Sequence, residues 1–139
     1  MEKQIFINLA VEDVEKSMQF YQACGFTLHP LFTDEDQKCL VWSEAIYVML
    51  QTKAFASAYL KKAFEKTSGA QMVSHTLPVE NPQEVDHILE KALIAGGTEP
   101  VPAIREEFMY LRSFQDPDGN LWGIMSLDIG KFMALKNRG

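Results

Sequence analysis

The sequence has few cysteines, no long apolar run and no surplus of positive charge, and each shortage excludes a class of protein. Its 139 residues include two cysteines, Cys24 and Cys39, which are too few for a disulfide framework and too far apart for a Cys-x-x-Cys metal or redox motif. No apolar stretch approaches the ~20 residues of a membrane-spanning helix. The formal net charge of -6 argues against nucleic acid as a partner, because phosphate binding requires a basic patch.

The remaining composition is that of an ordinary globular protein. With 47% hydrophobic and 23% charged residues, the chain is expected to form one soluble domain with a substantial core. Residues 1–6 contain no basic region followed by an apolar stretch, so we expect no signal peptide and a cytoplasmic location. The sequence also contains no phosphate-binding glycine loop, no dinucleotide fingerprint and no Ser-His-Asp arrangement.

Two segments of the sequence resemble each other. Residues 7–13 (Ile-Asn-Leu-Ala-Val-Glu-Asp) precede a predicted helix that ends at Gly25, and residues 75–81 (His-Thr-Leu-Pro-Val-Glu-Asn) precede one that ends at Gly96. The offset, 75 − 7 = 68 residues, is about half the chain. Each segment alternates between two faces in the manner of a strand. The repeat therefore predicts two similar halves.

Each predicted helix has a clear beginning. Asp13 is suited to cap the first, and Asn81 the second, where Pro82 takes the first helical position and Glu84 completes a capping box. Short strand-like runs follow both helices, at residues 26–32, 38–42, 46–51, 98–101, 108–115 and 121–127.

The predicted order of elements in each half is thus βαβββ. We expect a single domain that consists of four segments. We expect a first unit over 1–53, a connecting helix and linker over 54–70, a second unit over 71–128 and a tail over 129–139. The connecting helix is predicted for 54–66 with the linker at 67–70, and a short C-terminal helix for 129–136.

The last strand follows a distinctive turn, Phe114-Gln115-Asp116-Pro117-Asp118-Gly119-Asn120-Leu121-Trp122. Asp116 and Asp118 can accept hydrogen bonds from nearby backbone N–H groups, and Gly119 accepts a positive φ. With the duplicated βαβββ unit, this turn resembles the vicinal-oxygen-chelate superfamily of glyoxalase I, extradiol dioxygenases and bleomycin-resistance proteins. The resemblance implies an α+β fold in which two βαβββ units form a curved mixed sheet around a cup, and a homodimer.

The resemblance also implies where metal ligands would stand. Metal-dependent members use two side chains per unit, from the first and last strands, and the matching positions here are Phe6, Met49, Ser74 and Gly123. These four residues make no site for a divalent ion, which prefers imidazole or carboxylate ligands. We therefore expect no metal and no other cofactor, with Gly123 adding room where family enzymes place a carboxylate.

A cup lined in this way would be mostly apolar with a few polar anchors, as ligand sites usually are. The expected lining residues are Phe6, Asn8, Tyr47, Met49, Ser74, Thr76, Tyr110, Arg112 and Gly123. Arg112 is in phase with Tyr110 within its strand, so it could pair with a ligand carboxylate or phosphate. An internal ion pair or an exposed position is the alternative.

Other polar residues are expected to be structural. His75 is in phase with Leu77, on the face that packs against a helix, His87 is expected at the surface, and His29 is the histidine nearest to a pocket rim. The carboxylates of Glu106 and Glu107 point in opposite directions on an extended chain, which favours a solvated loop over acid–base chemistry.

The leading functional hypothesis is metal-independent binding of a small, partly apolar ligand, without catalysis. The alternative is a divalent-metal-dependent lyase, dioxygenase or transferase of the same superfamily that uses non-standard ligands. A third reading is a dimeric scaffold whose cup is filled by its own side chains.

Overall fold

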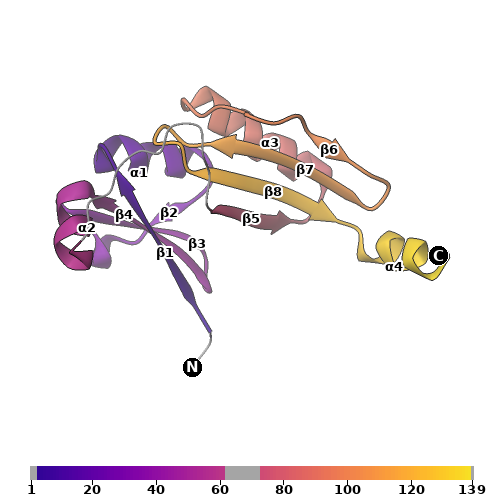
Figure 1. The fold of residues 1–139 in the computed structure, drawn as a ribbon, viewed down its shortest axis with the longest axis horizontal. Coiled ribbons are helices and arrows are strands. Elements are labelled where there is room, and N and C mark those ends of the chain that lie inside the picture. The colour runs from indigo at the N-terminus through magenta and orange to yellow at the C-terminus, as the bar shows by residue number, and fades with distance from the viewer. Residues whose placement is uncertain (1–2, 62–72, 139) are drawn as a thin grey trace. The chain divides into compact units, whose positions relative to one another are not determined.

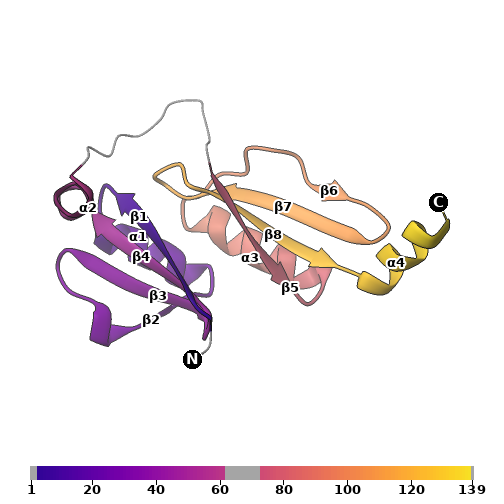
Figure 2. The same ribbon diagram turned by 60° about the horizontal axis from the view of Figure 1, so that its bottom comes forward.

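The computed structural model describes residues 3–61 and 73–138. The chain divides into two compact units, residues 1–68 and 69–139, and each unit has its own four-stranded sheet with one long helix on one face (Figure 1 and Figure 2). Among the described residues, no helix is both long and apolar enough to cross a membrane.

The first unit has the predicted βαβββ order followed by a short helix. Its elements are β1 (Ile5–Val11), α1 (Val14–Ala23), β2 (Thr27–Leu28), the 3-10 turn η1 (Pro30–Phe32), β3 (Gln37–Ser43), β4 (Ile46–Thr52) and α2 (Lys53–Leu60). The strand order is β1-β4-β3-β2, with β1 parallel to β4 and the other pairs antiparallel. β1 is therefore an edge strand of its sheet.

The predicted cap and stop of α1 are confirmed. The Asp13 carboxylate accepts hydrogen bonds from the backbone N–H groups of Glu15 and Lys16 at 3.0 and 3.1 Å, which satisfies donors that have no partner within the helix. Gly25 follows with φ of 109°, in the region that favours glycine. The core of this unit lies between α1 and one face of the sheet, and includes Val11, Phe20, Tyr21, Leu40, Val48 and Leu50.

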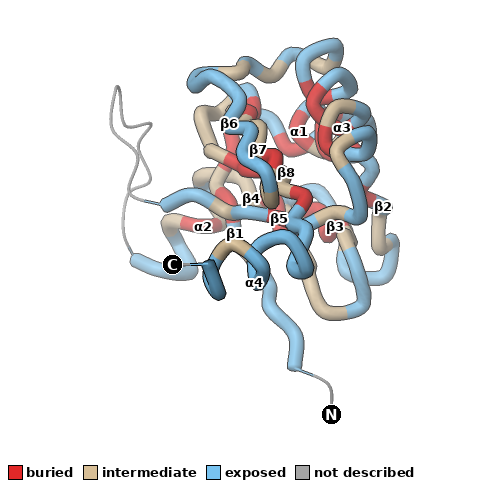
Figure 3. Tube along the Cα trace, turned by 90° about the vertical axis from the view of Figure 1, so that its right-hand side faces the viewer, coloured by how far each residue is buried: buried red, intermediate tan, exposed pale blue. Residues whose placement is uncertain are grey.

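The second unit repeats this arrangement. Its elements are β5 (Ser74–Val79), α3 (Pro82–Ile94), β6 (Ile104–Arg105), β7 (Met109–Gln115), β8 (Leu121–Leu127) and α4 (Ile129–Arg138). The strand order is β5-β8-β7-β6, with β5 parallel to β8 at the edge of the sheet. Its core lies between α3 and the sheet and includes Leu77, Val85, Leu89, Phe114, Trp122 and Ile124. In contrast to α3, residues of α4 are exposed or half-buried throughout (Figure 3).

The capping box of α3 is also confirmed. The Asn81 side chain accepts a hydrogen bond from the N–H of Glu84 at 2.9 Å, and the Glu84 carboxylate accepts one from the N–H of Glu80 at 2.9 Å. The backbone N–H groups of Glu80 and Glu84, before and within the first turn of α3, therefore both have side-chain acceptors.

The turn between β7 and β8 is organised by one buried carboxylate. Asp116 is 4% exposed, and its Oδ1 accepts the backbone N–H groups of Asp118 and Asn120 at 3.0 and 2.8 Å. Its Oδ2 accepts the Asn120 side-chain N–H at 2.8 Å. Gly119 has φ of 91°, as the turn motif predicts.

Three predicted elements differ from the structure. The strand predicted for 98–101 is wrong: Thr98 makes one isolated bridge to Gln115, and the short strand lies at 104–105, because prolines at 100 and 102 cannot donate ladder hydrogen bonds. The strand predicted for 26–32 stops at Leu28, where Pro30 begins η1. The connecting helix predicted for 54–66 is observed over Lys53–Leu60 and ends at Lys61, which has a left-handed φ of 55°; residues 62–66, and the linker at 67–70, lie outside the described residues. The C-terminal helix predicted for 129–136 is confirmed.

Candidate functional site

In the first unit, four predicted lining residues share the sheet face opposite α1. β1 and β4 are parallel with Phe6 beside Tyr47 and Asn8 beside Met49, and residues in register on neighbouring strands point to the same side. The alternate residues of these strands, such as Leu9 and Val48, belong to the core under α1. The structure thus brings Phe6, Asn8, Tyr47 and Met49 together on one face of the sheet.

This face carries a hollow of about 500 Å³ in the first unit. It is lined by Phe6, Asn8, Leu31, Phe32, Thr33, Asp34, Gln37, Met49 and Gln51. The volume lies within the range of small-molecule sites, and the mixture of aromatic and aliphatic walls with a few amides is typical of them. We call this hollow the β1–β4 pocket.

One wall of the β1–β4 pocket was missed by sequence reasoning. Leu31 and Phe32 are 80% and 54% exposed on η1, and Thr33 fixes this turn by donating to the carbonyl of His29 at 3.0 Å and accepting the N–H of Cys39 at 3.1 Å. Gln37 and Gln51, which strand alternation could have found, are opposite each other in the β3–β4 register.

The floor of the pocket is partly preorganised. The Phe6 and Tyr47 rings stack with centroids 4.7 Å apart and planes 10° apart. The Gln51 side-chain amide donates to that of Gln37 at 3.4 Å. Asn8 makes no side-chain hydrogen bond in the part of the chain that the structure describes, so its amide is available to a ligand.

Cys39 lies on the same sheet face but carries no exposed thiol. It is fully buried, in register with Met49, and burial raises the pKa of its thiol. The neutral thiol is a small apolar group under the pocket rather than a nucleophile.

In the second unit, Ser74, Thr76 and Gly123 share the sheet face opposite α3. Thr76 is in register with Gly123, and Ser74 with Leu121 two residues earlier on β8. A Cβ placed on Gly123 would lie 3.0 Å from Thr76 Oγ1 and 3.2 Å from Leu111 Cδ1. This corrects the expectation that Gly123 adds room, because the space above it is already filled by these two side chains.

The four family ligand positions do not fit a divalent ion. Phe6 and Gly123 offer no donor atom, Met49 is a thioether, and the backbone of Gly123 is covered by Thr76 and Leu111. Hard and borderline divalent ions prefer carboxylate, imidazole or thiolate ligands. Over residues 3–61 and 73–138, no group of three or more His, Cys, Asp or Glu side chains is placed to hold a metal ion.

Arg112 and Tyr110 do not lie with Gly123, which corrects their predicted position. In the β7–β8 register, Arg112 is beside Ile124 and Tyr110 beside Ser126, whereas Gly123 is beside Ser113. Both side chains therefore lie on the α3 side of the sheet.

There Arg112 forms the internal ion pair that the sequence left as the alternative. Its Nε and one terminal nitrogen donate to Glu99 at 2.9 and 2.7 Å, and the other donates to Asp86 at 2.9 Å. Tyr110 donates its hydroxyl to Asp86 at 2.6 Å. The hydrogen bonds from Tyr110 and Arg112 lower the pKa of Asp86, those from Arg112 lower the pKa of Glu99, and the pairing with Glu99 and Asp86 raises the pKa of Arg112.

The histidines contribute no cluster. His75 packs on Trp122 with centroids 4.9 Å apart, and burial lowers its pKa, which agrees with the predicted packed role. His87 is exposed, also as predicted. His29 packs on Phe32 at 4.8 Å, and its buried Nδ1 has no hydrogen-bond partner among the described residues; it is not part of the pocket lining.

Comparison with known proteins agrees with this geometry. Residues 3–42 match the family model described as bleomycin resistance protein-like N-terminal, and no curated protein sequence matches the chain significantly. A hypothetical protein from S. aureus is 26% identical, with a TM-score of 0.74 over 91% of this chain and 95% of that one. A glyoxalase/bleomycin resistance protein/dioxygenase family enzyme from Burkholderia phytofirmans PsJN is 20% identical, with a TM-score of 0.77 over 91% and 99%.

A glyoxalase-related enzyme from Fulvimarina pelagi is also 20% identical, with a TM-score of 0.75 over 91% of this chain and 88% of that one. The chain thus has the fold of the glyoxalase, bleomycin-resistance and dioxygenase proteins.

Proposed function

We propose that the protein binds a small, flat, partly apolar molecule in the β1–β4 pocket without a metal ion. One observation carries the proposal: Phe6 and Met49, at positions where family enzymes have ligands, are themselves walls of a hollow of about 500 Å³. An aromatic ligand could pack on the face of Phe6, whose other face is held by the Tyr47 ring at 4.7 Å.

The polar groups of the pocket support a neutral ligand. The side chains of Asn8, Gln37 and Gln51 supply amides, and the only charged residue among the lining residues is Asp34. Asp34 already accepts the N–H groups of Asp36 and Gln37 at 2.8 and 3.0 Å. Arg112, which the sequence offered as a partner for an anion, is engaged by Glu99 and Asp86 in the other unit.

The test is elemental analysis combined with native mass spectrometry of the purified protein. The proposal expects less than stoichiometric metal and, where a molecule co-purifies, an organic ligand of a few hundred daltons or less. One zinc, nickel, manganese or iron ion per chain, retained after gel filtration, would instead favour the metal-dependent alternative.

Assembly and location remain proposals as well. We propose a homodimer, on the superfamily resemblance, and a cytoplasmic protein, on the acidic composition and two free buried cysteines. Light scattering during gel filtration and cell fractionation test them, and a monomer at micromolar concentration would contradict the first.

A further inference from the structure

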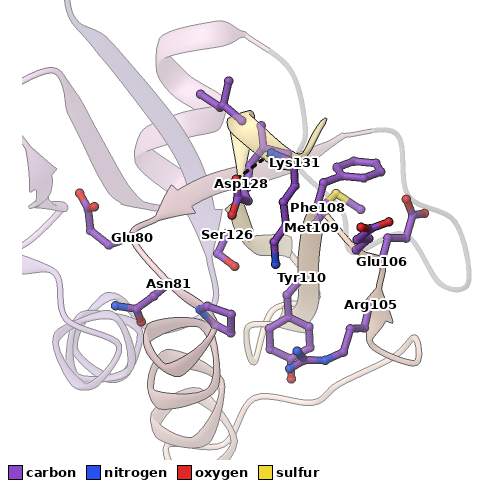
Figure 4. A pocket seen from close by; sticks show the side chains of 14 residues that line it. Glu80, Asn81, Arg105, Glu106, Phe108, Met109, Tyr110, Ser126, Asp128 and Lys131 are labelled. Atoms are coloured by element: carbon purple, nitrogen blue, oxygen red, sulfur yellow. Dashed lines mark hydrogen bonds between the residues drawn. The ribbon is translucent and has the colours of Figure 1, made fainter. Parts of the chain in front are cut away.

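The second unit contains another hollow, of about 590 Å³, on the α3 side of its sheet. It is bounded by the beginning of α3 at Asn81, by the segment from Arg105 to Tyr110, and by the end of β8 with the first turn of α4 (Figure 4). Tyr110 and Ser126, which are in register, line it from the sheet. This face is opposite the one that carries Thr76 and Gly123, and the hollow lies in the second unit, so it is separate from the β1–β4 pocket.

Ser126 is the first sign of a ligand. The residue is 6% exposed and lines the hollow, and its hydroxyl has no hydrogen-bond partner in the part of the chain that the structure describes. Its Oγ is not among the buried side-chain atoms without a partner, which over the described residues are Ser17 Oγ and His29 Nδ1, so the hydroxyl is open to the hollow. A ligand in the hollow could therefore accept a hydrogen bond from it.

Lys131 is the second. It projects from the first turn of α4 into the hollow (Figure 4), and its ammonium forms no ion pair with any described residue. The base of this helix is fixed: the Asp128 N–H donates to the Phe108 carbonyl at 2.7 Å, Asp128 Oδ1 caps the Lys131 N–H at 2.9 Å, and the Phe108 and Phe132 rings pack at 5.0 Å. The backbone of Lys131 is therefore fixed at the beginning of α4, and its side chain extends into the hollow from there.

The charges restrict the ligand further. Glu106 and Glu107 are exposed, and Figure 4 shows Glu80 and Glu106 directed away from Ser126 and Lys131. Arg105 lies over the Tyr110 ring, 3.9 Å from its centroid. Asp128 also lines the hollow, and its carboxylate accepts the backbone N–H of Lys131. These carboxylates leave room for at most a single negative charge beside Lys131 and disfavour a dianion such as a phosphate monoester.

The remaining walls are apolar and suit an organic body. Phe108, Met109 and Ile129 line the hollow beside the ring of Tyr110. We propose that this hollow binds a small organic monocarboxylate, with the carboxylate accepting hydrogen bonds from Lys131 Nζ and Ser126 Oγ and its apolar body on these side chains. The site is distinct from the β1–β4 pocket, so its failure would leave the proposed function standing.

Benzoate is a suitable probe for the intact protein, followed by amide NMR. We expect saturable shifts at Met109, Ser126 and Ile129, with a dissociation constant on the order of 1 mM for so small a ligand. Benzamide, which is neutral, and phenyl phosphate, which is a dianion, should each bind at least about 10-fold more weakly.

Substitutions of Lys131 and Ser126 test whether these two side chains bind the carboxylate. Lys131→Gln and Ser126→Ala should each weaken benzoate binding, the first by about 10-fold because it removes a charge-assisted hydrogen bond. Lys136→Gln, on the same helix but outside the lining, is the matched control and should bind benzoate as the wild type does. Phe6→Ala, in the other pocket, should also leave it unchanged.

Three outcomes would overturn the proposal. They are no saturable shift at these residues, equal binding of benzamide, or equal weakening by Lys131→Gln and Lys136→Gln. The Lys131 side chain is at the surface of α4, so the exchange to Gln tests binding in a folded protein, and the unchanged amide spectrum away from the hollow confirms this.

Discussion

Thr76 Oγ1 lies 3.0 Å from the point where a β-carbon on Gly123 would stand, and Leu111 Cδ1 lies 3.2 Å from it. These two side chains cover the backbone of Gly123. The glycine therefore permits close packing between neighbouring strands, and a side chain cannot be added there without moving Thr76 or Leu111.

Gly123→Ala should destabilise the protein by about 1 kcal/mol, because crowding costs more than the ~0.5–1 kcal/mol that replacing a strand glycine returns. Urea unfolding measures this. In a Thr76→Ala background the loss should shrink by at least about half, since the nearest contact is gone. Gly130→Ala is the control: its Cβ would meet only Asp128 Oδ1 at 3.4 Å, so the exchange should be neutral or stabilising. Equal effects at both glycines would contradict the packing argument.

Asp116→Ala should lower the free energy of unfolding by about 2–4 kcal/mol, because the N–H groups of Asp118 and Asn120 and the Asn120 amide lose their acceptor in a half-buried turn. Thermal unfolding by circular dichroism checks this. Asp36→Ala, at an exposed turn residue of the first unit, should change stability by less than about 0.5 kcal/mol. A small effect at Asp116 would mean that the turn is held by its backbone alone.

The Arg112 network should make stability depend on acid pH. The folded-state pKa values of Asp86 and Glu99 lie below their ordinary 3.8 and 4.5, so the unfolded chain binds protons first as the pH falls. Their contribution is complete above the ordinary values and is lost as pH falls through the folded-state values.

Arg112→Met should therefore lower stability at neutral pH by about 1–2 kcal/mol and flatten the dependence of stability on pH below about 5. Urea unfolding between neutral and acid pH measures both effects. Lys91→Met, on the exposed side of α3, is the control. If wild type and Arg112→Met lose stability in parallel on acidification, the network is not the cause.

Phe6→Ala should weaken binding of a flat aromatic ligand to the β1–β4 pocket by about 10-fold, because stacking contributes about 1 kcal/mol beyond buried area. Fluorescence or NMR titration with a neutral naphthol measures this. Ile5→Ala is a matched control, because the Ile5 side chain is next to Phe6 in the sequence, is 54% exposed and does not line the pocket. Equal losses in the two variants would place the ligand elsewhere.

The sequence predicted those parts of the fold that depend on local chemistry. The caps at Asp13 and Asn81, the glycine stops and the turn built on Asp116 each need particular residues at particular spacings, and all are present in the structure. Alternation also placed Phe6, Asn8 and Met49 on one face, because all three belong to neighbouring strands with a clear apolar phase.

The predictions that were wrong depended on how neighbouring strands pair and on where a strand ends. Alternation gives the phase within β7 and within β8, but which residue of β7 stands beside Gly123 is set by the turn that joins them. The observed register puts Ser113 there and sends Arg112 to the other side. The wall of the β1–β4 pocket formed by Leu31 and Phe32 follows from Pro30 ending a strand early, which alternation cannot anticipate.

The two edge strands of the repeat are not equivalent. β1 consists of Ile5–Val11, every residue of which has a backbone N–H, whereas β5 includes Pro78. Proline is tolerated at a sheet edge, where its missing donor interrupts the ladder that another chain would need. The edge strand β5 thus contains an obstacle to strand addition that β1 lacks. Resistance to association along the backbone is therefore expected to be greater for the second unit than for the first.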